Sequence, residues 1–245
     1  MVEIWLNESI TIGGIRELDR RHTIIITTCR YCDMKGKLIL FPVPIGAEEI
    51  TSSLPAANAE LLASCHTFIV EELRTARRFL KKAGYSYAID KGENIGLLSE
   101  AGLPCVADPG AMITKVAQRR GIEVVPLIGP SSLMLALMAS GFNGQSFAFV
   151  GYLPVDKSRR ASTIKHLEER LHREHQTQIF IEAPYRNNQM LEALSAVLQP
   201  NTMICVACDL TLPTQYIRSL SAAKWKTERE KINLHKRNTV FLIGE

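Results

Sequence analysis

The alternation of short apolar runs with helix-like stretches constrains this 245-residue chain more than any other feature. Apolar runs typical of strands occur at residues 38–41, 67–70, 95–99 and 124–127. Helical stretches lie between them at residues 48–64, 72–83 and 111–120. The last two end at Gly84 and Gly121, the residue type expected just past a helix. Strand–helix–strand repetition predicts an α/β fold with a parallel sheet and right-handed crossovers.

A second block of the same kind begins near Phe147, after an apolar helix at residues 131–140 and a turn-rich stretch at 141–144. Its predicted strands are residues 147–150, 178–181, 203–208 and 239–243, and its predicted helices are 158–172 and 186–198. We therefore predict an N-terminal α/β domain at residues 37–143 and a C-terminal α/β domain at 144–245. Residues 1–36 hold one β-like run without a partner pattern, so we expect an appendage, with Met34 as the natural start.

Composition is that of a globular protein, with 46% hydrophobic and 22% charged residues. No apolar run approaches the roughly 18 residues of a membrane helix, and the N-terminus has no secretory signal, so we expect a cytoplasmic protein. The net charge of +4 permits nucleic-acid contact without arguing for it. Basic residues gather at residues 74–82 and 224–237, which we interpret as a solvated helix face and a solvated loop.

Two CxxC pairs, Cys29/Cys32 and Cys205/Cys208, could together suggest a zinc site. The second pair lies in a predicted strand, where residues three apart point to opposite faces, so four ligands could not easily converge. His172 and His175 stand near the end of a polar helix, and we expect them to face solvent. We therefore expect no metal site.

Turns rich in Gly and Pro follow the strands of the first block, at residues 41–46, 98–104 and 127–132, and a fourth opens a helix at 107–110. In a parallel sheet the carboxyl ends of the strands share one edge, and ligands bind outside it. A single Gly- and Pro-rich turn after a strand is common and indicates no function. Several such turns at one edge of the same sheet predict a small-molecule pocket. The chain has no GxxxxGK[ST], GxGxxG or GxSxG sequence, which removes the main support for nucleotide-binding loops and a serine hydrolase.

Seven ordered motifs between residues 37 and 245 resemble the tetrapyrrole methylase superfamily, and within it the ribosomal RNA small subunit methyltransferase I family. They are Pro42–Gly46, Val70–Arg74, Ser99–Pro104, Ala107–Gly110, Gly129–Ser131, Gly151–Pro154 and Glu182–Arg186. The resemblance implies two α/β domains with S-adenosylmethionine in the cleft between them, and a homodimer. It also implies methyl transfer to a ribose 2′-hydroxyl of small-subunit ribosomal RNA, whereas other members methylate corrin precursors or a modified histidine.

The resemblance also implies the site residues. The cofactor would lie against Pro44, Ile45, Gly46, Ser99, Glu100, Ala101, Gly102, Val106, Ser131, Ser132 and Ala183. Glu182 and Glu71, each just after a strand, are candidates for a general base that accepts the hydroxyl proton. Glu182 could instead orient Arg186, and Arg74 and Arg186 could hold an anionic acceptor or pair with these carboxylates.

Four departures from the family pattern keep other functions open. Relatives have Ser-Asp-Ala-Gly-Thr-Pro at residues 99–104, Ala-Glu-Asp-Thr-Arg at 70–74, and basic residues flanking the segment at 208–211. The segment between Gly84 and Ile95 is also too short for the strand and helix that relatives carry there. The alternatives are a methyltransferase for a tetrapyrrole or other small molecule, a degenerate S-adenosylmethionine-binding protein, and an RNA-associated scaffold.

Overall fold

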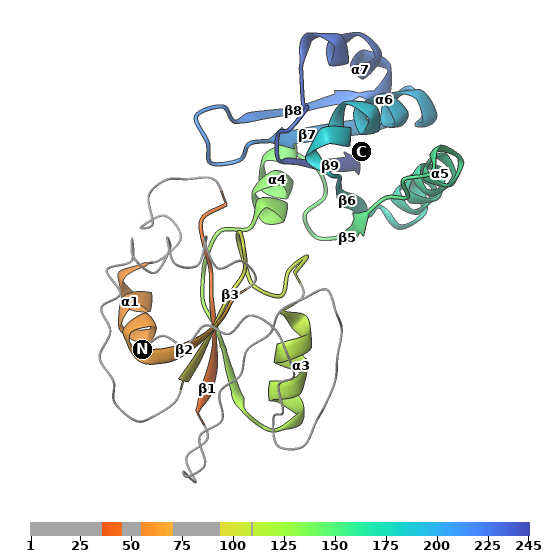
Figure 1. The fold of residues 1–245 in the computed structure, drawn as a ribbon. Helices are drawn as coiled ribbons and strands as arrows, with labels where there is room; N and C mark the ends of the chain where they lie inside the picture. The colour runs from red at the N-terminus through yellow and green to blue at the C-terminus, as the bar shows by residue number, and fades with distance from the viewer. Residues whose placement is uncertain (1–35, 46–54, 71–93, 109) are drawn as a thin grey trace. The chain divides into compact units, whose positions relative to one another are not determined.

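The computed structural model describes residues 36–45, 55–70, 94–108 and 110–245 of the chain. The chain divides into two compact units, Met1–Pro130 and Ser131–Glu245, each built around its own sheet (Figure 1). The predictions for the appendage at residues 1–36 and for the short segment after Gly84 fall largely on residues 1–35 and 71–93, which lie outside the described residues.

The described part of the first unit contains a parallel sheet. Its strands are β1 (Lys37–Phe41), β2 (Cys65–Val70), β3 (Asn94–Leu98) and β4 (Glu123–Pro126). Their order across the sheet is β2-β3-β1-β4, and each neighbouring pair is parallel. All four predicted strands are confirmed, as is the parallel arrangement that strand–helix alternation predicted.

Apolar side chains cover both faces of this sheet, which explains why its strands are nearly continuous apolar runs. One face, beside helix α1 (Ala56–Ala63), buries Ile39, Phe41 and Leu62. The other face, beside helix α3 (Ala111–Arg119), buries Leu38, Leu97 and Ala117. Gly121 follows α3 with a φ of 63° and confirms the predicted helix end.

The second unit also combines helices with strands. Its strands are β5 (Phe147–Tyr152), β6 (Thr177–Ile181), β7 (Met203–Cys208), β8 (Tyr216–Ser221) and β9 (Thr239–Gly244). Its α-helices are α4 (Ser132–Ser140), α5 (Lys157–Glu174), α6 (Asn187–Val197) and α7 (Ala222–Glu228). Short 3-10 turns, η2 (Pro184–Arg186) and η3 (Arg229–Lys231), precede α6 and follow α7.

The second sheet is mixed, with the order β5-β6-β9-β7-β8. β5 and β6 are parallel, and β9, the last strand in sequence, lies between β6 and β7 and is antiparallel to both. β7 and β8 form an antiparallel pair. The central strand of this sheet is therefore β9, the last strand in the sequence.

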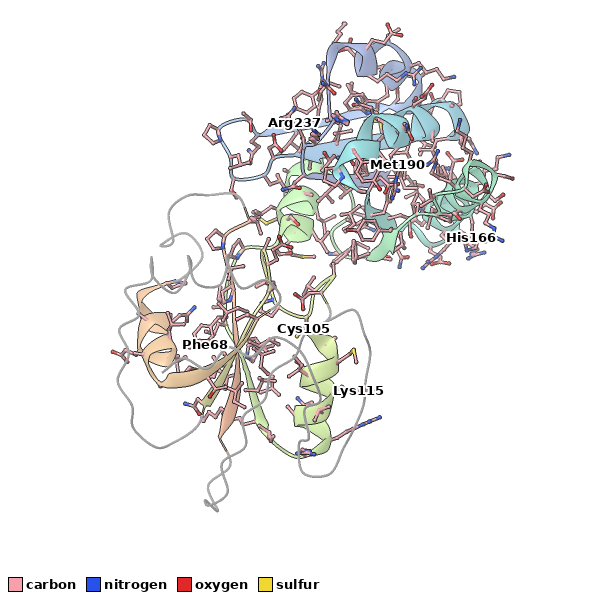
Figure 2. All side chains as sticks on the ribbon, viewed as in Figure 1. Phe68, Cys105, Lys115, His166, Met190 and Arg237 are labelled. Carbon is pink, nitrogen blue, oxygen red and sulfur yellow. The ribbon has the colours of Figure 1, made fainter. Side chains whose placement is uncertain are left out.

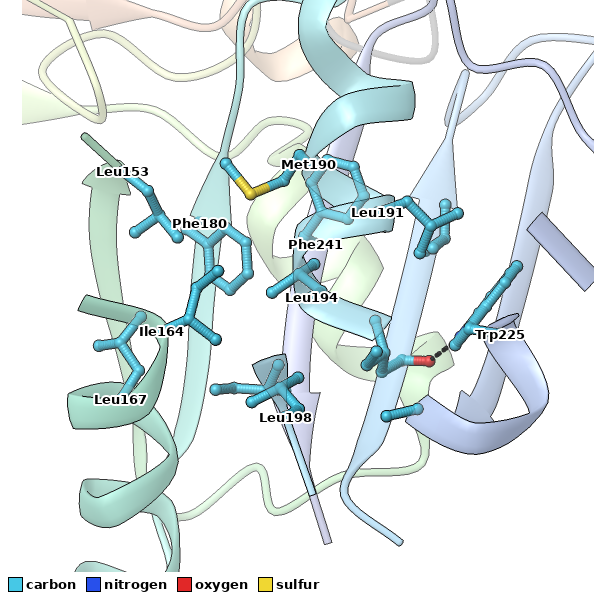
Figure 3. Packing of buried hydrophobic residues seen from close by; sticks show 14 of the residues in the cluster. Leu153, Ile164, Leu167, Phe180, Met190, Leu191, Leu194, Leu198, Trp225 and Phe241 are labelled. Carbon is cyan, nitrogen blue, oxygen red and sulfur yellow. Dashed lines mark hydrogen bonds between the residues drawn. The ribbon is translucent and has the colours of Figure 1, made fainter. Parts of the chain in front are cut away.

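Helices pack on both faces of the second sheet. α4 contacts β7, β8 and β9, and its Leu133, Ala136 and Leu137 share one buried core with Ile179 of β6 and Leu242 of β9. On the other face α5, α6 and α7 enclose the core shown in Figure 3, where the rings of Phe180 and Phe241 stack with centroids 5.9 Å apart. Cys205 belongs to the first of these cores and Cys208 to the second, so the two thiols point to opposite faces, as the strand spacing predicted.

The boundary between the units lies earlier than the sequence predicted. We placed it between residues 143 and 144, because residues 141–144 have the composition of a linker. The structure divides the chain after Pro130, because α4 buries its apolar face on the second sheet and therefore belongs to the second unit. Gly141 ends α4 with a φ of 79°, so these residues form a helix end rather than an interdomain linker.

The sequence analysis missed β8 and α7, and its interpretation of residues 224–237 as a solvated loop was wrong. Trp225 of α7 is fully buried, and its indole N–H donates to the Ile204 carbonyl oxygen at 2.9 Å (Figure 3). The basic residues Lys224 and Lys226 flank it on the exposed side of the same helix. A single tryptophan among charged residues carries no periodic signal, which is why the helix was not predicted.

Among the described residues, no helix is both long and apolar enough to cross a membrane.

The role of Trp225 leads to a stability prediction. Trp225→Ala is expected to lower the free energy of unfolding by about 3–5 kcal/mol, because it removes a fully buried ring and leaves a cavity. Urea denaturation followed by circular dichroism measures this change. Lys226→Ala, an exposed position on the same helix, is the matched control and should change stability little. Equal effects of the two substitutions would contradict the buried placement of α7.

Candidate functional site

The loops that follow β1 and β3 are joined at the carboxyl edge of the first sheet. β1 and β3 are parallel neighbours, so their carboxyl ends lie side by side. Beyond them, Val43 and Gly102 exchange both backbone hydrogen bonds, Val43 N to Gly102 O at 2.9 Å and Gly102 N to Val43 O at 3.1 Å. The two predicted cofactor loops therefore form one connected backbone structure.

Gly102 is the residue that permits this connection. Its φ of 74° lies in the left-handed region, where residues with a Cβ are strained. A Cβ built at this position would lie 3.0 Å from Cγ2 of Ile45 and 3.6 Å from the carbonyl oxygen of Pro130. Gly102 thus marks the place where the loops after β1, β3 and β4 approach one another.

The loop after β4 packs equally closely on the loop after β1. A Cβ at Gly129 would lie 2.0 Å from Cβ of Pro42, so no larger residue fits there without movement of the backbone. Pro42 in turn has a fixed φ, which holds its loop in one conformation. These Gly and Pro residues, which the sequence pattern had pointed out, therefore allow the backbones of the loops to approach one another closely.

Ser99 and Asp108 fix the rest of this edge by hydrogen bonds to the backbone. Ser99 is 5% exposed, and its hydroxyl donates to the carbonyl oxygens of Ala101 and Gly102, both at 3.3 Å. Asp108 Oδ1 accepts from the backbone N–H of Cys105 at 3.2 Å and of Gly110 at 2.6 Å. These bonds shape the turns, so Ser99 is a loop-ordering residue in this structure.

The Cys105 thiol stands at the N-terminal end of α3, beside Thr114 Oγ1 at 3.2 Å (Figure 2). Burial raises the pKa of this thiol, while the hydrogen bond to Thr114 opposes the rise. Near neutral pH Cys105 is therefore a protonated thiol and not a nucleophilic thiolate.

The structure brings most of the predicted cofactor residues of the first unit to this edge. Pro44, Ile45, Ser99, Glu100, Ala101 and Gly102 all belong to the two joined loops. Val106 lies on the following loop and is 44% exposed. Gly46, Glu71 and Arg74 lie outside the described residues.

In the second unit, Glu182 and Arg186 form an ion pair directly after β6. Glu182 has a fully buried side chain, and its Oε1 accepts from Arg186 Nε at 3.0 Å, Arg186 NH2 at 2.6 Å and Ala183 N at 2.7 Å. The hydrogen bond to Glu182 raises the pKa of Arg186, burial opposes the rise, and smaller contributions come from Tyr185 and Tyr152. Of the two roles predicted for Glu182, the geometry matches the one in which it orients Arg186.

The second oxygen of Glu182 is buried and accepts no hydrogen bond from the described residues. A buried carboxylate oxygen without a donor is costly, so the three bonds at Oε1 must hold this charge in place. Glu182 is 4% exposed as a residue, so this carboxylate is enclosed by protein.

Ser131, Ser132 and Ala183 are the remaining predicted cofactor residues, and all three belong to the second unit. Ser131 is the N-cap of α4, where its hydroxyl accepts from Met134 N at 3.5 Å. Ala183 leads into η2 and its carbonyl oxygen accepts from Arg186 N at 2.8 Å. After α4 the ring of Phe142 lies against Gly244 at the end of β9, so the N-terminus of α4 points toward the edge where β9 begins and β6 ends.

The sequence analysis missed a second ion pair at this edge. Arg237, labelled in Figure 2, donates from its Nε to Asp209 Oδ2 at 2.7 Å and from its NH2 to the Thr214 carbonyl oxygen at 2.6 Å. Burial is the largest single influence on the pKa of Arg237 and lowers it, but the hydrogen bond to Asp209 and the electrostatic effects of Cys208 and Asp209 together outweigh burial, so the net shift is upward. Asp209 stands in the segment whose departure from the family pattern was noted, but nothing in the sequence pointed to a partner in the stretch before β9.

His172 and His175, which were expected to face solvent, are indeed exposed, yet both contact the same carboxylate. Their Nδ1 atoms lie 3.2 and 3.1 Å from the two carboxyl oxygens of Glu245. Hydrogen bonds from His175 and His172 lower the pKa of Glu245. Glu245 follows β9, so this cluster lies at the opposite edge of the sheet from Glu182.

Known proteins resemble this chain in sequence and in fold. A family model described as Tetrapyrrole (Corrin/Porphyrin) Methylases matches residues 10–224, and the match starts within the segment that we expected to be an appendage. The chain is 34% identical over 163 residues to the ribosomal RNA small subunit methyltransferase I of Pseudomonas aeruginosa, which covers 66% of this chain and 54% of the relative. It thus spans about half the length of that relative.

Two further relatives with the same name are covered more fully. The Bacillus subtilis protein is 35% identical over 192 residues, covering 72% of this chain and 64% of the relative. The Buchnera aphidicola protein is 30% identical over 203 residues, covering 76% of this chain and 70% of the relative.

Solved structures show the same fold. A putative diphthine synthase from Entamoeba histolytica matches with a TM-score of 0.58 at 17% identity, covering 85% of this chain and 92% of that one. The methyltransferase CobJ matches with a TM-score of 0.54 at 16% identity, covering 86% and 94%. At these identities the likeness is one of fold alone.

The ion pair after β6 leads to a second stability prediction. Arg186→Ala is expected to lower the free energy of unfolding by about 2 kcal/mol, because Glu182 stays buried without its cation while the lost guanidinium was partly exposed. Urea denaturation measures the change. Arg173→Ala, which removes the exposed pair with Glu174, is the control and should have little effect. A loss in the Arg186 variant no larger than in the control would show that Glu182 does not depend on Arg186.

Proposed function

Because the chain belongs to the tetrapyrrole methylase family, and within it to the ribosomal RNA small subunit methyltransferase I family, we propose that it is an S-adenosylmethionine-dependent methyltransferase of small-subunit ribosomal RNA. The acceptor in this proposal is a ribose 2′-hydroxyl. The observation that carries the proposal is the similarity to relatives of that name, because it extends over both units of the chain. The joined loops at the carboxyl edge of the first sheet support it.

The residues of that edge fit S-adenosylmethionine. The cofactor carries an adenosine and a methionine, which neutral backbone N–H and C=O groups and small apolar side chains can bind. The loops after β1 and β3 offer such groups at Pro44, Ile45 and Ala101, and Gly102 allows the close approach of Ile45 that holds these loops together. Ser131, Ser132 and Ala183 remain predicted contacts of the second unit.

Bound S-adenosylmethionine would supply an activated methyl group with a neutral leaving group. The task of the protein is then mainly to align the acceptor oxygen with that methyl group. We assign this positioning role to Arg186, because Glu182 Oε1 accepts from both its Nε and its NH2 and the side chain stays partly exposed. A planar guanidinium suits a phosphate group next to the acceptor ribose.

Glu182 is an orienting residue in this proposal rather than a general base. Its Oε1 is occupied by three N–H donors and its Oε2 is buried, so neither oxygen is open to the proton of a substrate hydroxyl unless the surrounding residues move. The role of Glu71 as a base stays a prediction, as does that of Arg74.

The other functions left open by the sequence have less support. The structures of the methyltransferase CobJ and of a putative diphthine synthase share the fold at 16–17% identity, whereas the two more fully covered relatives named for ribosomal RNA are 30–35% identical. The degenerate-binder alternative rested on altered motifs, yet the altered loop at residues 99–104 keeps the ordered backbone pairing of Gly102. The proposal includes a homodimer that acts in the cytoplasm, which the family resemblance supports.

Cofactor binding is the first test of the proposal. Calorimetric titration of S-adenosylmethionine and S-adenosylhomocysteine into the purified chain is expected to show binding in the micromolar range. Gly102→Ala should weaken it by about tenfold, because a Cβ at a φ of 74° strains the backbone by roughly 1 kcal/mol or more and presses on Ile45.

Gly144→Ala is the matched control, since a Cβ there meets nothing within 4 Å. It should bind both ligands like the wild type. Absence of binding of either ligand at millimolar concentration would refute the methyltransferase proposal, and equal affinities of the two alanine variants would refute the placement of the cofactor at the Val43–Gly102 pairing.

A further inference from the structure

One edge of the second sheet collects loops that are far apart in sequence. β5 and β6 end there, with Tyr152 paired to Ile181. Because β9 is antiparallel to β6 and β7, it begins at this edge, and β7 ends there with Cys208 paired to Thr239. The segments after β5, β6 and β7 and the segment before β9 therefore meet along one line.

Two exposed aromatic rings stand on this edge. Tyr152 is 63% exposed and Tyr185 is 58% exposed, although tyrosine rings are more often partly buried. The guanidinium carbon of Arg186 lies 5.0 Å from the centroid of the Tyr185 ring, and Arg186 NH1 donates to the Tyr185 hydroxyl oxygen at 3.0 Å. Since that oxygen accepts from Arg186, the hydroxyl hydrogen remains available to a ligand.

Basic side chains accompany these rings. Lys236 is exposed, and its backbone N–H donates to the Pro184 carbonyl oxygen at 3.0 Å, which fixes it beside Tyr185 and Arg186. Arg237 follows it and is held by Asp209. The stretch before β9 thus supplies both Lys236 and Arg237 at this edge. We call Tyr152, Tyr185, Arg186, Lys236 and Arg237 the aromatic-basic edge.

From this arrangement we infer that the aromatic-basic edge binds an unpaired segment of the RNA substrate, with Tyr152 and Tyr185 stacking on bases and Arg186 and Lys236 contacting phosphates. The inference rests on the proposed function and adds to it the binding surface and the single-stranded form of the acceptor. Aromatic faces contribute to affinity only when the bases are splayed out of a helix. In duplex RNA the base faces are covered, and proteins recognise it instead through phosphates and 2′-hydroxyls.

The opposite edge of the same sheet provides a contrast. It carries Phe147, which is 38% exposed, and the cluster of His172, His175 and Glu245, in which a carboxylate would repel phosphate. Phe147 is therefore a matched control: an exposed aromatic residue on the same sheet, at the wrong edge.

The test is fluorescence anisotropy of a short fluorescein-labelled oligouridylate titrated with the chain at several salt concentrations. Tyr152→Leu and Tyr185→Leu should each weaken binding by about tenfold, the size expected for one lost base stack. Tyr185→Phe should keep most of the affinity because the ring remains. Phe147→Leu should bind like the wild type. Lys236→Ala should weaken binding and reduce the slope of log affinity against log salt by about 0.7.

The outcomes separate this inference from the proposed function. Failure of the wild type to bind the oligouridylate, tyrosine-to-leucine variants with wild-type affinity, or equal competition by duplex RNA of the same length would each overturn the inference. S-adenosylmethionine binding and methyl transfer by the wild type would still stand in those cases. Conversely, binding that depends on both tyrosines, together with no methyl transfer to small-subunit RNA, would support the edge and refute the proposed function.

Discussion

The pairing of β9 with both β6 and β7 is the constraint on which the second unit depends. All six residues of β9 are buried, and the strand joins the parallel pair β5-β6 to the antiparallel pair β7-β8. Without β9, neither β6 nor β7 would have a hydrogen-bonded neighbour on the side that faces the centre of the sheet. Because β9 runs antiparallel to its neighbours, its beginning meets the carboxyl ends of β6 and β7, and this places Lys236 and Arg237 beside Glu182 and Asp209.

The two units contribute different chemistry. In the first unit the described site consists of backbone: paired loops at Val43 and Gly102, close packing at Gly129, and turns held by Ser99 and Asp108. In the second unit it consists of charged and aromatic side chains held by ion pairs. This division fits a reaction in which the cofactor needs a shaped cradle and a polyanionic acceptor needs orientation.

Periodicity explains what could be predicted from the sequence. The strands of the first sheet are buried on both faces and read as apolar runs, and Gly121 and Gly141 mark helix ends by their positive φ. The Gly and Pro loops were found because close backbone approach demands those residue types. Glu182 was located as a candidate residue, but its orienting role depends on distances to Arg186 that a sequence does not contain.

Long-range pairing explains what could not be predicted. Trp225 is buried because its indole reaches Ile204, 21 residues away, although its neighbours are charged. The domain boundary was misplaced because α4 looks equally apolar whichever sheet it packs against, and only its contacts with β7, β8 and β9 decide. Tyr152 and Tyr185 stand in motifs that were noted after strands, yet their shared edge follows from the position of β9 in the sheet, which the order of elements along the chain does not reveal.

The most direct test of the account is methyl transfer itself. The chain is incubated with methyl-labelled S-adenosylmethionine and small-subunit ribosomal RNA, and the RNA is then digested to nucleosides and separated. The account predicts label in a 2′-O-methylated nucleoside, which is recognisable because a blocked 2′-oxygen makes the following phosphodiester resistant to alkali. Label on a base, or none in the RNA while S-adenosylmethionine still binds, would contradict it.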